Sequence, residues 1–138
     1  TAVSGSFDKV IASFDSKLFQ QLNPPFPPVK LLRFDGSKKG DLVALELNFI
    51  VFRQSWISEI TENYQDLNHF YFVDKGVQLP FFLSQWRHKH VVERNQQGSL
   101  IIDDISFRSP FLLMDILLFP VLYLQFLYRK PIYKKYFR

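Results

Sequence analysis

The sequence has no cysteine among its 138 residues. A disulfide framework, a thiolate metal site and a thiol nucleophile are therefore excluded. Glycine is scarce, with five residues, and none forms a phosphate loop, because Gly36 and Gly40 flank a turn between two apolar segments and no Gly-Lys-Ser/Thr motif is present. No serine lies in a nucleophile-elbow motif. The chain thus lacks the simplest signatures of thiol, phosphate-loop and serine-hydrolase chemistry.

Acidic residues are absent after Asp115, whereas five of the last ten residues are basic. The remaining 12 basic residues are balanced by 13 acidic residues, so the rest of the chain is near neutral. Nucleic-acid binders spread cations over a face, so we expect no nucleic-acid partner. A basic end after an apolar stretch is typical of a solvated helix C-terminus, a membrane-surface contact or a site for an acidic partner. Thr1–Val3 show no targeting signal, so we expect a cytoplasmic protein, with membrane association as the alternative.

Aromatic residues are abundant, at 17% of the chain, and 16 of them are phenylalanine. Hydrophobic residues make up 47% and charged residues 22%, which is typical of a globular fold. The length fits a single domain spanning residues 1–138. So much ring surface in a small domain predicts either a large core or a lined cavity.

The pattern predicts helices on either side of an antiparallel meander. Residues 6–22 read as one or two short helices with Ser6 as N-cap, and the proline-rich segment 23–28 ends them. Ser109 and Pro110 are expected as N-cap and first residue of a long apolar helix. Strands are expected at residues 29–34, 42–52, 54–62, 68–74, 83–94 and 99–108. This order predicts an α+β fold in which a curved antiparallel sheet wraps a long C-terminal helix.

The segment Asn95–Gly98 predicts a tight hairpin with Gln96 and Gln97 at its centre. In that register His90 faces Asp103 directly, close enough for a hydrogen bond. The neighbouring pairs on the same, mostly apolar and buried face are Val92 with Ile101, His88 with Ile105, and Trp86 with Phe107. The opposite, solvent-facing side pairs Lys89 with Asp104 and Arg87 with Ser106.

A buried histidine opposite an aspartate has several interpretations. It fits a polar pair that fixes strand register, a polar handle in a ligand cavity, or a general acid/base dyad. A metal site formed by His88, His90 and either His69 or Asp103 is weakly supported, because no third ligand is convincingly spaced. We therefore predict no metal and no cofactor.

The spacing Trp86-x-His88-x-His90, followed by Asp103-x-Ile105-x-Phe107 and then Pro110, resembles the START-like SRPBCC superfamily. The resemblance covers nearly the whole chain. It implies a helix-grip fold with a deep hydrophobic cavity, as in lipid and sterol carriers, polyketide cyclases and many bacterial proteins of unknown function. The family begins with a full strand, for which only residues 1–4 remain here, so the first strand is expected to be short or truncated.

The last apolar segment, residues 111–128, is apolar nearly all round, whereas the resemblance implies an amphipathic helix. Its 18 residues are near the lower limit for crossing a bilayer. Asp115 and Pro120 oppose a span. A sheet covers only part of such a helix, so a second subunit in a homodimer, the N-terminal helices or peripheral lipid is expected to cover the remainder.

The leading functional prediction is a non-enzymatic module that binds a hydrophobic small molecule, of lipid, isoprenoid or polyketide type, between the sheet and the last helix. One alternative is a cyclase- or dehydratase-like enzyme with His90 as base and Asp103 as its orienting group. Another is a membrane-associated interaction protein that uses the last helix and the basic tail. The expected ligand-binding residues are Trp56, Trp86, His88, His90, Asp103, Ile105 and Phe107.

Overall fold

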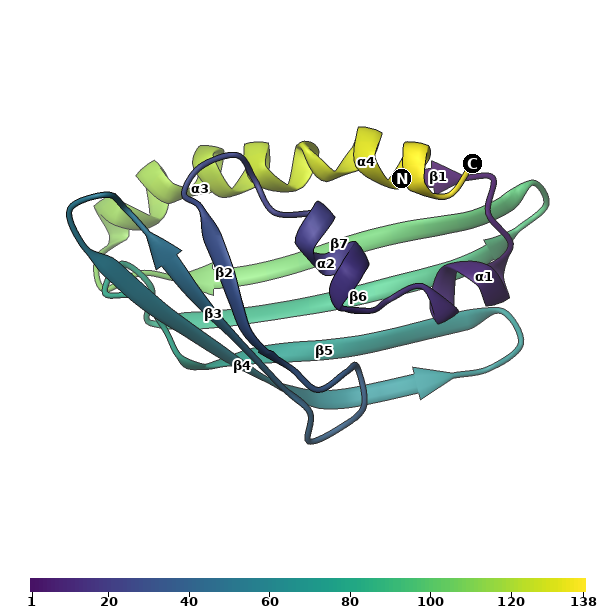
Figure 1. The fold of residues 1–138 in the computed structure, drawn as a ribbon, viewed down its shortest axis with the longest axis horizontal. Helices are drawn as coiled ribbons and strands as arrows, with labels where there is room; N and C mark the ends of the chain where they lie inside the picture. The colour runs from purple at the N-terminus through teal and green to yellow at the C-terminus, as the bar shows by residue number, and fades with distance from the viewer.

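A computed structural model describes residues 1–138 as an α+β fold (Figure 1). Seven antiparallel strands form one curved sheet in the order β1-β7-β6-β5-β4-β3-β2. Two short helices precede the six-stranded meander, and two consecutive helices follow it. The elements are β1 (Ala2–Val3), α1 (Phe7–Ala12), α2 (Ser16–Gln21), β2 (Val29–Phe34), β3 (Leu42–Asn48), β4 (Arg53–Gln65), β5 (His69–Gln78), β6 (Gln85–Asn95), β7 (Gly98–Arg108), α3 (Leu112–Leu127) and α4 (Arg129–Tyr136).

The N-terminal segment closes one edge of the sheet. β1 is as short as expected and pairs with β7 through Ala2 and Val3. The amino group of Thr1 donates a hydrogen bond to the carbonyl oxygen of Ile101 at 2.7 Å. Ser6 caps α1 as predicted, since its side chain accepts from the backbone N–H of Lys9.

Several predicted boundaries are wrong: β4 extends to Gln65 and not to residue 62, and β5 extends to Gln78 and not to residue 74. The third strand, β3, ends at Asn48 and not at residue 52, because Ile50 adopts a φ of 75° and turns the chain at the β3–β4 tip. The long helix begins at Leu112 with Phe111 as N-cap, so Ser109 is not the cap and Pro110 is not its first residue. The backbone N–H of Ser109 instead donates to Asp115, which holds residues 109–110 in a turn before the helix.

The interior is filled at one end of the sheet and sparsely filled at the other. Ten buried residues from α1, α2, α4 and the sheet form the main cluster, which includes Phe7, Leu18 and Phe137. At the other end only Leu83, Trp86 and Leu122 form a buried cluster. α3 and α4 run along β7 in Figure 1, yet Leu122 is the only buried residue of α3. α3 therefore covers the sheet as a loose lid and not as a packed core helix.

Gly98 provides a test of how tightly β1 is attached. Its φ is 146°, and a Cβ there would collide with the backbone of Val3 and Ser4. Gly40 has a φ of 94° but open space around it. We expect Gly98→Ala to lower the free energy of unfolding by about 3 kcal/mol and Gly40→Ala by about 1 kcal/mol. Urea denaturation of both variants measures this difference, and equal losses would contradict the close contact with β1.

Candidate functional site

The predicted register of the β6–β7 hairpin is confirmed at every pair. His90 lies opposite Asp103, His88 opposite Ile105, and Trp86 opposite Phe107. His88, His90 and Trp86 are buried on the inner face. The hairpin turn and the period of two thus bring two imidazoles and one carboxylate onto the concave side of the sheet.

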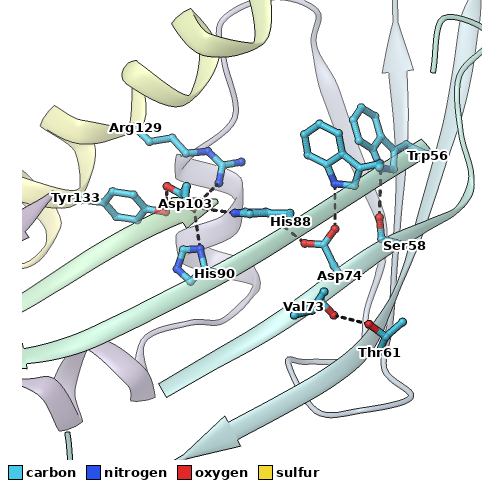
Figure 2. Close-up of polar contacts among 11 residues, drawn as sticks. Trp56, Ser58, Thr61, Val73, Asp74, His88, His90, Asp103, Arg129 and Tyr133 are labelled. Carbon is cyan, nitrogen blue, oxygen red and sulfur yellow. Dashed lines mark hydrogen bonds and ion pairs between the residues drawn. The ribbon is translucent and has the colours of Figure 1, made fainter. Parts of the chain in front are cut away.

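Asp103 is the centre of a buried polar network (Figure 2). Its Oδ1 accepts from Nδ1 of His90 at 2.8 Å and from Nε2 of His88 at 2.9 Å. Its Oδ2 accepts from the Tyr133 hydroxyl at 3.4 Å, and Arg129 lies 3.8 Å from Oδ1. One carboxylate on β7 therefore connects β6 with α4.

A second carboxylate, Asp74 on β5, extends the network toward the tryptophans. Its Oδ2 lies 3.3 Å from Nδ1 of His88, and its Oδ1 accepts from Nε1 of Trp86 at 3.1 Å. The rings of Trp86 and Trp56 meet edge to face at 4.8 Å between centroids. Trp56 in turn donates to the Ser58 hydroxyl. His88 is thus held between two carboxylates.

Asp74, Arg129 and Tyr133 were not predicted from the sequence. A usable signal existed for each of them. Phe70, Phe72 and Asp74 alternate along β5 and therefore share one face. Arg129 and Tyr133 are four residues apart and therefore lie on one face of α4.

The charges of the network follow from its geometry. Burial alone lowers the pKa of His88, but hydrogen bonds to Asp103 and Asp74 outweigh it and raise the pKa to about 9. For Asp103, burial acts in the opposite direction and raises the pKa. The contacts with His90, His88 and Arg129 outweigh burial and hold the pKa of Asp103 well below its usual value. His88 is therefore an imidazolium at neutral pH, between two carboxylates.

His90 has the opposite charge state. Burial lowers its pKa, and the attraction of Asp103 does not compensate. The ring is therefore neutral, and its single proton lies on Nδ1, because that nitrogen must donate to the ionised Asp103. Nε2 carries a lone pair, is buried and has no hydrogen-bond partner. Phe14 and Phe72 enclose the ring, with centroids at 4.4 and 5.2 Å.

His88, His90 and Asp103 also satisfy the spacing of a metal cluster, since one donor atom from each lies within 4.8 Å of the others. The chemistry opposes a cation here. The donor atoms already bond one another, and the Arg129 guanidinium lies beside the same carboxylate oxygen. His69 does not join them: it begins β5, is exposed and lies 3.5 Å from Asp66. The arrangement fits a hydrogen-bonded charge network better than a metal centre.

A cavity of about 650 Å³ lies between the concave face of the sheet and the helices α2 and α3. Of its 35 lining residues, 23 are hydrophobic. Four of the predicted site residues line it, namely Trp56, Trp86, His88 and His90. Asp103, Ile105 and Phe107 line instead a smaller hollow of about 470 Å³ between β7 and α3. The α3 and α4 side chains that face the larger cavity are Met114, Leu117, Leu118, Val121, Leu122, Gln125, Phe126 and Arg129.

Comparison of the chain with protein-family models, with curated proteins and with solved structures finds no match. The site is therefore described by its own geometry. That geometry is an apolar cavity with two edge-to-face tryptophans on its wall and a buried histidine–carboxylate network beside them.

The raised pKa of His88 predicts how stability depends on pH. A group whose pKa rises from 6.5 to about 9 on folding contributes its full stabilisation below pH 6.5 and loses it as pH rises through 9. We expect the free energy of unfolding to fall by up to about 3 kcal/mol across this window. Urea denaturation at several pH values measures it.

His88→Gln is expected to remove most of this pH dependence, and His69→Gln, at the exposed start of β5, is the matched control. NMR titration of the wild-type imidazoles supplies a readout that does not require the variant to fold. A His88 midpoint near its ordinary value would contradict the doubly paired imidazolium.

Proposed function

We propose that the protein binds a hydrophobic small molecule in the cavity between its sheet and α3. The observation that carries this proposal is an apolar cavity of about 650 Å³ in a domain with only 24 buried residues. Pockets for small molecules commonly have volumes of about 300–1,000 Å³ and combine apolar walls with a few convergent polar groups.

The walls supply both kinds of group. Aromatic rings line the cavity from several elements, and Trp56, Trp86 and Phe126 contribute large apolar area. His88, Asp74 and Arg129 lie together on one part of the wall. A ligand with a long apolar body and a polar end, of lipid, isoprenoid or polyketide type, fits this distribution.

The resemblance to the START-like SRPBCC superfamily agrees with this proposal. The α+β architecture, the strand order and the long C-terminal helix are compatible with a helix-grip fold. Membership in that superfamily is part of the proposal, and it rests on the Trp-x-His-x-His and Asp spacing together with this architecture.

A cyclase- or dehydratase-like enzyme is the second candidate, and one observation favours it. The neutral His90 ring has an unpaired lone pair on Nε2 while Asp103 fixes its orientation, which is the arrangement of a general base. Phe14 and Phe72, however, enclose the ring on the filled side of the network. His90 lines the cavity but its Nε2 is buried, so a substrate could reach that atom only after neighbouring side chains move, and binding without catalysis is the simpler function.

Binding is tested with N-phenyl-1-naphthylamine, a neutral apolar fluorophore, because Trp56 and Trp86 on the cavity wall serve as energy donors. We expect saturable binding with a Kd in the micromolar range, which corresponds to about −8 kcal/mol. Val43→Trp places a large ring in the cavity and is expected to weaken binding about tenfold or more.

Val77→Trp is the matched control, because Val77 lies on β5 and is exposed outside the cavity. Circular dichroism melting confirms that both variants fold. Equal binding by the wild type and Val43→Trp would place the fluorophore elsewhere and contradict the proposal.

A further inference from the structure

Aromatic rings from three loops, all exposed except the half-buried Phe49, meet at one end of the sheet. Phe26 lies in the α2–β2 loop, Phe49 and Phe52 at the β3–β4 tip, and Phe81 in the β5–β6 connection. Their rings form a chain of contacts: Phe26 to Phe49 at 6.4 Å, Phe49 to Phe52 at 5.0 Å, and Phe52 to Phe81 at 5.8 Å between centroids. Phe26, Phe49 and Phe81 also line the large cavity, so this aromatic group forms part of its wall.

The tip of this aromatic group is the most exposed apolar feature of the chain. Ile50 and Val51 are 83% and 86% exposed. Ile50 also has a φ of 75°, a conformation that β-branched residues rarely adopt. The backbone is thus held in a costly conformation with two aliphatic side chains in water, which points to a partner for them.

The apolar surface continues onto α3. Ser84 on the β5–β6 connection donates to the carbonyl oxygens of Arg108 and Ser109, which joins that connection to the start of the helix. Most other side chains of α3 are exposed, among them Leu112, Leu113 and Phe119. We call the β3–β4 tip, the aromatic group and the outer surface of α3 together the apolar rim.

We propose that the apolar rim docks on the surface of an anionic lipid bilayer and that the cavity exchanges its hydrophobic ligand with the bilayer there. The exchange of ligand rests on the proposed function, whereas the docking of the rim on the bilayer does not. Exposed residues that do not line the larger cavity spread over the outer arc of α3, including Leu112, Leu113, Ile116 and Leu124. A protein partner covers one stripe of a helix, whereas the fluid interface of a bilayer covers a wide arc.

The charge pattern identifies the kind of bilayer. Asp115 is the only ionisable acid or base between residues 111 and 128 apart from tyrosine, and it accepts from the backbone of Ser109. Beyond that apolar stretch lie five cations and no acid, and four of these cations remain for headgroups because Arg129 belongs to the Asp103 network. Lys134 and Lys135 are exposed on α4. An apolar helix followed by such a cluster is complementary to anionic headgroups.

The helix is suited to lie along the bilayer and not to cross it. The segment Leu112–Tyr136 is long and apolar enough to span a membrane by length and composition. Its two ends are, however, attached to one domain. Ser109 bonds Asp115 at the start, and Tyr133 and Phe137 are buried in the main core cluster at the end. Crossing would require the C-terminal residues to leave that core.

The test is flotation of the full chain with vesicles of phosphatidylcholine alone and of phosphatidylcholine with about one third phosphatidylglycerol. We expect binding to the anionic vesicles and several-fold weaker binding to the neutral ones. Ile50→Ser/Val51→Ser is expected to reduce binding about tenfold. Leu67→Ser is the matched control, because Leu67 is 82% exposed in the β4–β5 turn at the other end of the sheet.

Lys134→Gln/Lys135→Gln is expected to abolish the preference for anionic vesicles. Absence of vesicle binding, or equal binding by the wild type and Ile50→Ser/Val51→Ser, would overturn the proposal. Light scattering tests whether a second copy of the chain covers the rim instead. A wild-type dimer that Ile50→Ser/Val51→Ser dissociates would also overturn the proposal. Binding of N-phenyl-1-naphthylamine in solution is expected to survive the rim substitutions. A wild-type protein that does not bind this fluorophore would therefore contradict the proposed function, whether or not it binds vesicles.

Discussion

The buried carboxylate of Asp103 is the interaction on which the rest of the structure depends. It accepts from two histidines on β6 and lies against Tyr133 and Arg129 of α4. An ionised carboxylate in this interior is tolerated only because each oxygen has a donor. The same contacts hold α4 against the sheet. Since Leu122 is the only buried residue of α3, that helix is positioned mainly by its ends: the Ser109–Asp115 contact and the anchored α4. The network therefore holds the lid of the cavity in place.

The network also lies at the boundary between two kinds of interior. On one side His90 packs against Phe14 and Phe72, which pack against the main core cluster and also line the edge of the cavity. On the other side His88 and Asp74 lie beside Trp86, which faces the hollow end. Two adjacent histidines consequently have opposite charge states, because one is held between two carboxylates and the other is enclosed by rings with one. Both histidines line the cavity, so two nearby positions of one strand present it with opposite charge states.

The sequence predicts the α+β architecture, the strands and the β6–β7 register well, because all three depend on local signals: period-two patterning and a hairpin turn at Asn95–Gly98. It does not predict that Asp74 pairs with His88, because β5 and β6 are joined by an irregular connection whose geometry sets the register. Arg129 and Tyr133 reach Asp103 only through the tertiary placement of α4. The start of α3 was misplaced because a Ser-Pro pair is equally suited to a turn, and here the Asp115 side chain stabilises that turn.

The sequence predicts that the sheet covers only part of the apolar helix α3, and in the structure Leu122 is its only buried residue. An apolar helix is ordinarily buried far more completely. Here its inner side faces a cavity and its outer side faces water. Monomeric soluble proteins rarely expose so large an apolar surface, because each exposed aliphatic side chain forgoes about 1.5–3 kcal/mol of burial. Both sides of α3 therefore need an apolar neighbour that the chain itself does not supply. The proposed hydrophobic ligand would meet the need inside, and the proposed lipid surface would meet the need outside. For the proposed function, the loose packing of α3 is a requirement and not a defect of the core, because a helix packed firmly on the sheet would close the cavity.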